Sequence, residues 1–222
     1  MKNPFDWVLE DGVLGENLEV VKSPKNRESV FTIDGDLPKI SYTFNNDKLA
    51  SSPFYNSGII INRKVFTIET KANYDGPQTN LGDIILPENK IPKEYFIDKR
   101  QEDKWKYFKK GKSEKRINKA TGFEYNYSEG GMAFPDPLNK PSRTIITGEG
   151  GASASRFKHV IRTKKGNLRR LTPIELERLN MFPDNHTDGA SDIKRAFFMG
   201  NALVVGVIEK IGKGLVKKIK ES

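Results

Sequence analysis

The sequence predicts an α+β fold, rich in β-strands over its first three quarters and helical towards its end. Three stretches indicate this fold class. GIIINRKVFTIET, residues 58–70, places β-branched residues on both sides of a polar Asn-Arg pair, as a β-hairpin does. RRLTPIELERLNMFPD, starting at residue 169, contains the signals of a short capped helix. Residues 201–220 repeat apolar side chains at helical spacing.

Composition indicates a folded chain with excess positive charge. Of the 222 residues, 36% are hydrophobic and 10% aromatic, which is enough to build a core. Lys and Arg number 38 against 29 acidic residues, so the formal charge is +9. This excess favours a polyanionic partner such as nucleic acid without requiring one. No apolar run approaches the roughly 18 residues of a membrane span, and the N-terminus lacks a signal-peptide layout. A cytoplasmic protein without a membrane partner is expected.

The absence of cysteine restricts the chemistry of these 222 residues. It excludes disulfides, thiolate metal sites and a cysteine nucleophile. His159 and His186 are the only histidines, so a multi-histidine metal site is not expected either.

The segments around the predicted hairpin are less regular. The first 45 residues hold short apolar stretches, LEVV and SVFTI, between charged turns. After the hairpin, LGDIILPENKIPKEYFI predicts a short helical turn and then a loop broken by prolines. Residues 98–119 hold ten basic and four acidic residues, with three aromatic residues interleaved. That segment is either a solvated connector with aromatic anchors or a surface that contacts DNA phosphates, with Lys109 as a candidate contact.

PSRTIITGEGGASASRFKHVI, residues 141–161, predicts a strand, a glycine-rich loop and a second strand. Gly148, Gly150 and Gly151 permit close approaches that side chains would forbid. Arg143 and Arg156 flank the loop, which is either a generous turn or a loop lying against DNA. A phosphate-cradling nucleotide loop is not indicated, because the stretch lacks Gly-Lys-Ser/Thr.

The stretch from residue 169 to residue 187 predicts a short, rigid helix. It supplies an N-cap, a proline in the first turn, a glutamate that completes a capping box, two leucines of a hydrophobic staple and a terminating proline. In that order, these residues are Thr172, Pro173, Glu175, Leu171 with Leu176, and Pro183. Three arginines beside the helix, Arg169, Arg170 and Arg178, either tie it to neighbouring loops or lie at the surface.

The C-terminal stretch predicts a helix with one apolar stripe, which is typical of a residue set in a hydrophobic core. Glycines within it lower its intrinsic helix propensity, so tertiary packing is expected to hold it. The stripe consists of Val204, Ile208, Ile211, Leu215 and Ile219.

Two of these stretches resemble conserved motifs of the DNA (cytosine-5)-methyltransferases. RRLTPIELERLNMFPD resembles motif IX and FFMGNALVVGVIEKIG resembles motif X, in the family's order and roughly its spacing. PSRTIITGEGGASASRFKHV is similar to the target-recognition region, including its Thr144-Ile145 pair. The resemblance is clear over residues 135–220. The family's cofactor-binding glycine motif, Pro-Cys nucleophile loop and Glu-Asn-Val motif have no counterpart, and PKNRESVF lacks two residues of the Gln-x-Arg-x-Arg motif.

The resemblance implies a β-rich target-recognition domain over residues 1–168, a bracing helix and loop over 169–190, and a helical segment over 191–222. That last segment would complete a partner's α/β methyltransferase domain. The implied function is DNA recognition and cofactor-pocket completion for cytosine-5 methylation from S-adenosylmethionine, in a restriction-modification setting. Methylation requires a thiolate that adds to C6 of cytosine, so this chain is expected to be inactive without a separate or missing catalytic half.

Site residues follow from the resemblance position by position. Thr144 would contact the DNA backbone, and the loop from Gly148 to Arg156 would enter the major groove, where arginine can pair with guanine. The expected DNA-binding residues are Arg143, Thr144, Gly150, Gly151, Ser153, Arg156 and Lys109. The expected cofactor-binding residues are Gly200, Asn201, Ala202 and Leu203, which would meet S-adenosylmethionine only with the catalytic half. No catalytic residue is expected in this chain.

The expected partners are double-stranded DNA and a catalytic half, and the isolated chain is expected to self-associate through its C-terminal stripe or to leave it mobile. A natural small subunit and a shortened chain both suit the sequence. The alternatives are a stand-alone DNA-binding module without a methyltransferase role, and a fragment that keeps only structural remnants.

Overall fold

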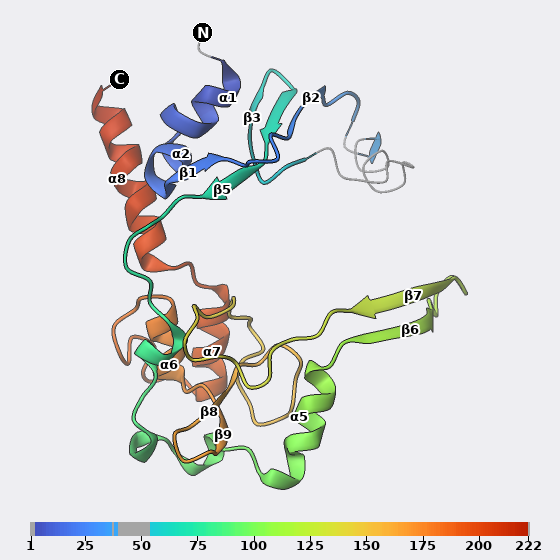
Figure 1. The fold of residues 1–222 in the computed structure, drawn as a ribbon, viewed down its shortest axis with the longest axis vertical. Helices are drawn as coiled ribbons and strands as arrows, with labels where there is room; N and C mark the ends of the chain where they lie inside the picture. Colours follow the sequence, from blue (N-terminus) through green and yellow to red (C-terminus); the bar gives the residue numbers. More distant parts are fainter. Residues whose placement is uncertain (1–2, 37, 40–53, 222) are drawn as a thin grey trace. The chain divides into compact units, whose positions relative to one another are not determined.

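The computed structural model describes residues 3–36, 38–39 and 54–221, and mixes helices with antiparallel strands, which confirms the α+β class (Figure 1). Two compact units form: one from residues up to 76 together with those from 207 onward, the other from residues 77–206. The division into three functional segments that the sequence suggested stays a prediction. Part of the early segment expected between residues 1 and 45 lies outside the described residues.

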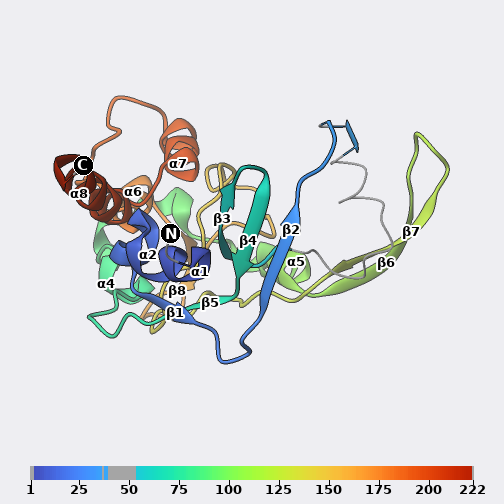
Figure 2. The ribbon, with the colours of Figure 1, turned by 90° about the horizontal axis from the view of Figure 1, so that it is seen from above.

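The first unit contains short helical turns and two small sheets. β1 pairs with β5, and β2, β4 and β3 form a second antiparallel sheet in that order (Figure 2). The elements are α1 (Pro4–Asp6), a π-helical turn (Trp7–Asp11), α2 (Val13–Leu18), β1 (Val20–Lys22), β2 (Glu28–Thr32), β3 (Ser57–Ile61), β4 (Lys64–Ile68) and β5 (Thr70–Ala72).

The hairpin predicted over residues 58–70 is confirmed as the β3–β4 pair. Its turn consists of Asn62 and Arg63, which have φ angles of 47° and 66°. Two successive left-handed residues form the tight turn that suits the twist of hairpin strands. The side chain of Arg63 fixes this conformation, because its Nε donates to the carbonyl of Ile33 at 2.7 Å.

The predicted C-terminal helix is α8 (Val205–Glu221), which belongs to the first unit from residue 207 onward. Its polar side meets α2 and the residue that follows it: Lys217 pairs with Glu16 at 2.7 Å and Lys210 with Glu19 at 3.1 Å. Gly214 is buried beside the Asn17 side chain, where a Cβ atom would overlap the amide. The apolar stripe lies beside this contact: Ile208, Leu215 and Ile219 are exposed, whereas Ile211 is half-buried. Val204, the first residue of the predicted stripe, precedes the helix and is also half-buried.

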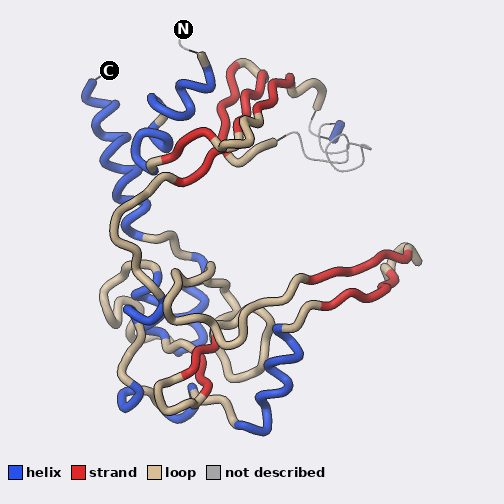
Figure 3. The backbone as a smooth tube through the Cα atoms, in the orientation of Figure 1, coloured by secondary structure: helices blue, strands red, loops and turns tan. Residues whose placement is uncertain are grey.

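The second unit is held by two apolar clusters. One consists of Leu81, Ile161, Leu171, Leu176, Ala196 and Met199, and the other of Trp105, Val160 and Leu168. The elements are α4 (Leu81–Ile84), 3-10 turns at Glu88–Lys90, Lys93–Tyr95 and Lys99–Gln101, α5 (Glu102–Lys109), β6 (Lys112–Ile117), β7 (Glu124–Glu129), β8 (Val160–Arg162), β9 (Leu168–Arg170), α6 (Pro173–Leu179) and α7 (Asp192–Asn201). Figure 3 separates these helices from the strand pairs.

The capped helix predicted after residue 171 is confirmed as α6, with its capping box formed by Thr172 and Glu175. Its end was predicted wrongly. The helix stops at Leu179, before the terminating proline, because Met181 adopts a left-handed conformation with φ of 62°. Asn180 secures this end by donating from Nδ2 to the carbonyl of Met199 at 2.8 Å.

The strand predicted at the start of residues 141–161 is not formed. Residues 141–147 are loop, and only β8 follows at Val160. Side chains replace the expected ladder bonds: Arg143 donates to Asp136 at 2.9 Å, and Ser142 lies 3.0 Å from the His159 ring. Side-chain hydrogen bonds to such a segment offer its residues an alternative to strand pairing.

Candidate functional site

The glycine-rich loop is closed at its base by Glu149 and His159. Glu149 accepts a hydrogen bond from the His159 backbone N–H at 2.9 Å and lies 2.7 Å from its Nδ1, and both side chains are buried. The other ring nitrogen, Nε2, lies 3.0 Å from Ser142 Oγ. Residues 149–159 therefore form a loop whose two ends are fixed before any ligand binds.

The interior of the loop is fixed by Lys158. Its Nζ donates to the carbonyls of Gly151 at 3.0 Å and Ser153 at 2.9 Å. Burial lowers the pKa of Lys158, with Arg170 contributing further. Gly150 packs on α7, where a Cβ atom would lie 2.9 Å from the Ile193 Cα. Gly151 has a φ of 80°, which glycine adopts readily.

The exposed Thr144 follows an anchored arginine. Arg143 Nε donates to Asp136 Oδ1, and the second carboxylate oxygen accepts from the Val160 N–H at 2.8 Å. The Nη2 atom of Arg143 is buried and makes no hydrogen bond with the described residues. Arg143 therefore holds Thr144 beside β8, while both N–H groups of its Nη2 lack an acceptor among the described residues.

Arg156 is occupied inside the chain. It pairs with Glu129 at 3.0 Å and donates to the carbonyl of Gly130, and its side chain is only 14% exposed. Longer bonds reach the carbonyls of Phe108 and Lys110, both at 3.5 Å. The guanidinium thus anchors the loop to residues 129 and 130, and base contact by Arg156 stays a prediction.

Lys109 does not lie on the surface, which corrects the expectation that it contacts phosphates. The residue is 1% exposed, and its Nζ donates to the carbonyl of Lys158. Burial, with the nearby Arg143 as a second cause, lowers the pKa of Lys109 to about 8. A surface cation was expected because neighbouring residues are basic. Instead, Lys109 joins the last turn of α5 to the glycine-rich loop through its hydrogen bond to Lys158.

The segment expected to meet the cofactor packs on the segment expected to meet DNA. Gly200, in the last turn of α7, lies so close to Ile146 and Thr147 that a Cβ atom would overlap their backbone. Asn201 donates from Nδ2 to the carbonyl of Phe197 at 2.9 Å, and Leu203 is 67% exposed.

Helix α6 braces this arrangement through a buried ion pair. Arg169 donates to Glu175 at 2.7 and 2.9 Å, and the same carboxylate accepts from the Leu86 N–H. Arg170 donates to the carbonyl of Glu94. These two arginines therefore tie the helix to neighbouring segments and do not lie free at the surface. Arg178 does the same, because it donates to the carbonyl of Ile84 at 3.0 Å.

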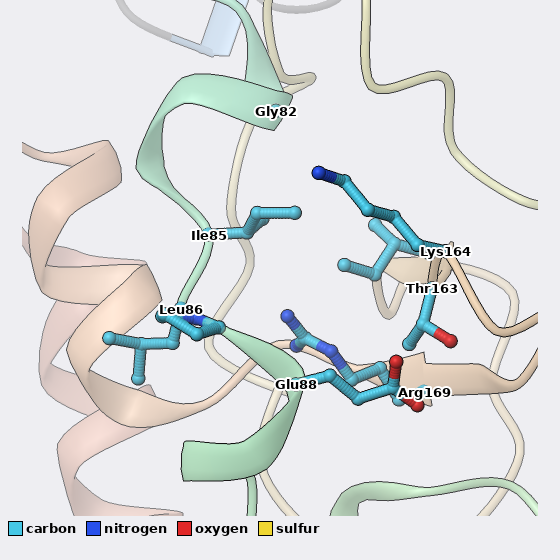
Figure 4. Close-up of a pocket in the computed structure, with 9 residues that line it drawn as sticks. Gly82, Ile85, Leu86, Glu88, Thr163, Lys164 and Arg169 are labelled. Atoms are coloured by element: carbon cyan, nitrogen blue, oxygen red, sulfur yellow. The ribbon is translucent and has the colours of Figure 1, made fainter.

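A cavity of about 420 Å³ borders the brace (Figure 4). Lys164 and Arg169 approach it from the β8–β9 side, and Ile85 and Leu86 from the segment after α4. None of the residues expected to bind DNA or cofactor lines it.

Sequence reasoning missed the acidic residues that position the site. Asp136 and Glu149 were not singled out, and neither was Glu177, which is fully buried and accepts from the backbone N–H groups of Asn185 and Thr187. Because glycines flank Glu149, the sequence indicates a flexible loop there and gives no sign that the carboxylate is buried. A signal was present, because Glu149 and His159 bracket the loop in the sequence.

Comparison with known proteins relates the chain to one family. The model of C-5 cytosine-specific DNA methylases matches residues 16–217. Type II methyltransferase M.Sau3AI of Staphylococcus aureus is 40% identical over 218 residues, which cover 97% of this chain and 50% of the relative. The chain thus spans about half the length of that relative. The match also includes the N-terminal segment, ahead of the region where the resemblance was clear.

A structural comparison gives a more distant likeness. The crystal structure of S. pombe Dnmt2 methyltransferase superposes with a TM-score of 0.44 and 12% identity, covering 92% of this chain and 59% of that one. Within the described residues, no helix is both long and apolar enough to cross a bilayer.

Proposed function

The chain belongs to the C-5 cytosine-specific DNA methylase family, and from that premise we propose that it supplies DNA recognition and one wall of the cofactor pocket for cytosine-5 methylation. The catalytic half would come from another polypeptide or from the remainder of a longer one. Similarity to a type II methyltransferase supports a restriction-modification setting.

One observation carries this proposal: a family match over residues 16–217 in a sequence without cysteine. Methylation at C5 needs a thiolate that adds to C6 and so activates C5 towards the methyl donor. The 222 residues supply no thiol, whereas about half of the relative's length has no counterpart here. The nucleophile therefore has to come from the other half.

On the DNA side, the preformed loop suits a surface that meets a duplex. Thr144 and Ser153 expose hydroxyl groups, and the glycines beside them allow close approach of a backbone. The loop is held at its ends by the Glu149–His159 contact and inside by Lys158. Loss of chain entropy on binding is small for a loop that is already ordered.

On the cofactor side, the residues fit one wall of a pocket for S-adenosylmethionine, the methyl donor of the family. Leu203 has an exposed apolar side chain. The Nδ2 of Asn201 donates to the carbonyl of Phe197, so its amide oxygen is the atom that would accept a hydrogen bond from the cofactor. The glycine before them serves packing on Thr147. When bound, the cofactor supplies the methyl group, and these residues would only hold it.

The exposed apolar face of α8 suits the contact with the catalytic half. Ile208 and Leu215 are 43% and 49% exposed, while the opposite side of the helix is held by Glu16 and Glu19. Burial of one such side chain contributes about 1.5–3 kcal/mol, and contiguous apolar faces of this kind usually mark an interface.

The test is reconstitution with a cysteine-bearing methyltransferase half, such as the part of M.Sau3AI that this chain does not cover. We expect tritiated methyl incorporation into DNA only when both parts are present. Leu215→Asp should abolish assembly in size-exclusion chromatography, whereas Lys213→Asp on the polar side should assemble normally.

Methyl transfer by the isolated chain would overturn the proposal. DNA binding without any restored activity, across several catalytic halves, would favour the stand-alone binding module instead.

A further inference from the structure

The longest strand pair in the second unit is the β6–β7 hairpin, which extends outward from the end of α5 (Figures 1 and 3). Lys112 pairs with Glu129 at its base and Ile117 with Glu124 near its tip. The turn from Asn118 to Phe123 is closed by hydrogen bonds from the Gly122 and Asn118 N–H groups. The feature is an ordered ribbon with well-defined faces.

One face of this ribbon is occupied by contacts within the chain. Lys112 lies over the Tyr107 ring at 4.2 Å, and Arg116 lies over Tyr127 at 3.5 Å and pairs with Glu114 at 3.3 Å. Glu129 pairs with Arg156. The charged groups on this face are thus matched within the protein.

The opposite face is different in character. Side chains alternate across a strand, so the directly opposed Lys115 and Asn126 share this face with the Ser113–Ser128 and Ile117–Glu124 pairs. All six residues are exposed, and their side chains make no hydrogen bond or ion pair with the described residues. We name this surface the open face of the hairpin; it consists of Ser113, Lys115, Ile117, Glu124, Asn126 and Ser128.

Two apolar side chains of the ribbon are exposed. Near the tip, Ile117 is 60% exposed and Phe123 is 68% exposed. A ribbon that exposes both polar and apolar side chains suits a partner whose surface carries charged groups as well as apolar ones.

We propose that the open face enters the major groove of the DNA duplex, with Asn126 and Lys115 contacting base edges. The groove is about 12 Å wide and admits a two-stranded ribbon. Asparagine pairs with adenine through two hydrogen bonds and lysine donates to guanine, while apolar side chains meet the thymine methyl group. Exposed Lys110 and Lys119 supply the charge that a phosphate backbone attracts.

This inference rests on the proposed function, because it gives that function a second DNA-reading element beside residues 149–159. Arg156 links the two elements: it sits in the loop and grips the hairpin base through Glu129 and Gly130. The hairpin and the loop are thereby held in one orientation to the same duplex.

Base reading is tested by selection from a randomised duplex pool, with sequencing of the bound fraction. Asn126→Ala and Lys115→Ala should each reduce the preference at one base pair by about 5- to 100-fold. Lys90→Ala, an exposed lysine in a 3-10 turn of the same unit, should leave every preference unchanged.

Proximity is tested by cross-linking, for which the chain is suited because it lacks cysteine. Ser128→Cys and Asn89→Cys each introduce one thiol for a photoactivatable label. We expect the Ser128→Cys conjugate to cross-link to bases of the bound duplex and the Asn89→Cys conjugate to give background.

Wild-type sequence preferences in both alanine variants would overturn base reading by the hairpin. Background cross-linking from Ser128→Cys in a wild-type-like DNA complex would overturn insertion. Neither result bears on the proposed function, which is tested separately by reconstitution of methyl transfer with the catalytic half. Absence of any DNA binding by the unaltered chain would instead overturn both proposals.

Discussion

Gly200 lies directly against the backbone of Thr147, so that the last turn of α7 touches the loop that carries Thr144. The contact joins the segment proposed for cofactor binding to the segment proposed for DNA binding. No side chain fits between them, because a Cβ atom on Gly200 would overlap main-chain atoms that cannot rotate away.

Gly200→Ala should therefore destabilise the chain by about 1–3 kcal/mol through overpacking. Gly212→Ala is the matched control, since a Cβ atom there meets no other atom within 4 Å. Alanine in that helix should be neutral or stabilising by up to about 1 kcal/mol. Urea unfolding of the three proteins checks this, and equal stability of both variants would contradict the tight contact.

Glu149→Gln should loosen the glycine-rich loop, because Glu149 bonds both the backbone and the ring of His159. A cost of about 1–3 kcal/mol is expected from a buried hydrogen-bonding group left unsatisfied. Hydrogen exchange of residues 150–157 should speed up as well. Glu124→Gln, on an exposed strand, should change neither quantity; unchanged exchange in the Glu149 variant would argue against the clamp.

Lys109 gives the protein a stability that rises with pH. Its pKa falls from 10.5 to about 8 on folding because of burial. Between these values the unfolded chain binds more protons than the folded chain, so the destabilisation present below about pH 8 is relieved as pH rises. Unfolding free energy attributable to Lys109 should increase by about 1–2 kcal/mol from pH 7.5 to 9.5.

The comparison for this effect is Lys109→Met, which keeps the apolar stem and removes the titrating group. Urea unfolding at both pH values should show the increase only in the protein that contains the lysine. Parallel pH profiles of the two proteins would mean that Lys109 keeps its charge when folded.

Arg156→Ala should release the base of the β6–β7 hairpin from the loop, because the guanidinium bonds Glu129 and Gly130. We expect faster hydrogen exchange at residues 112–129 and weaker discrimination among DNA sequences in the assembled enzyme. Arg100→Ala, which removes an exposed pair with Asp98, serves as the control. Loss of discrimination with unchanged exchange would instead favour direct base contact by Arg156.

The sequence by itself determined the features that depend on near neighbours along the chain. Thr172 and Glu175 form their capping box because the two residues lie one helical turn apart. Asn62 and Arg63 turn the hairpin because flanking β-branched residues favour strands. The motifs that indicate the family also lie in single continuous stretches, and the missing thiol is a matter of composition.

Only the tertiary structure decided which charged groups are available. Lys109 in the basic segment and Arg156 in the glycine-rich loop look like surface cations, yet they bond residues that are 49 and 26 positions away, respectively. Glu149 and His159 meet because a loop folds back, and Ile208 and Leu215 stay exposed because Glu16 and Glu19 hold the polar side of α8. The burial of a charge depends on what packs over it, and those neighbours come from distant parts of the chain.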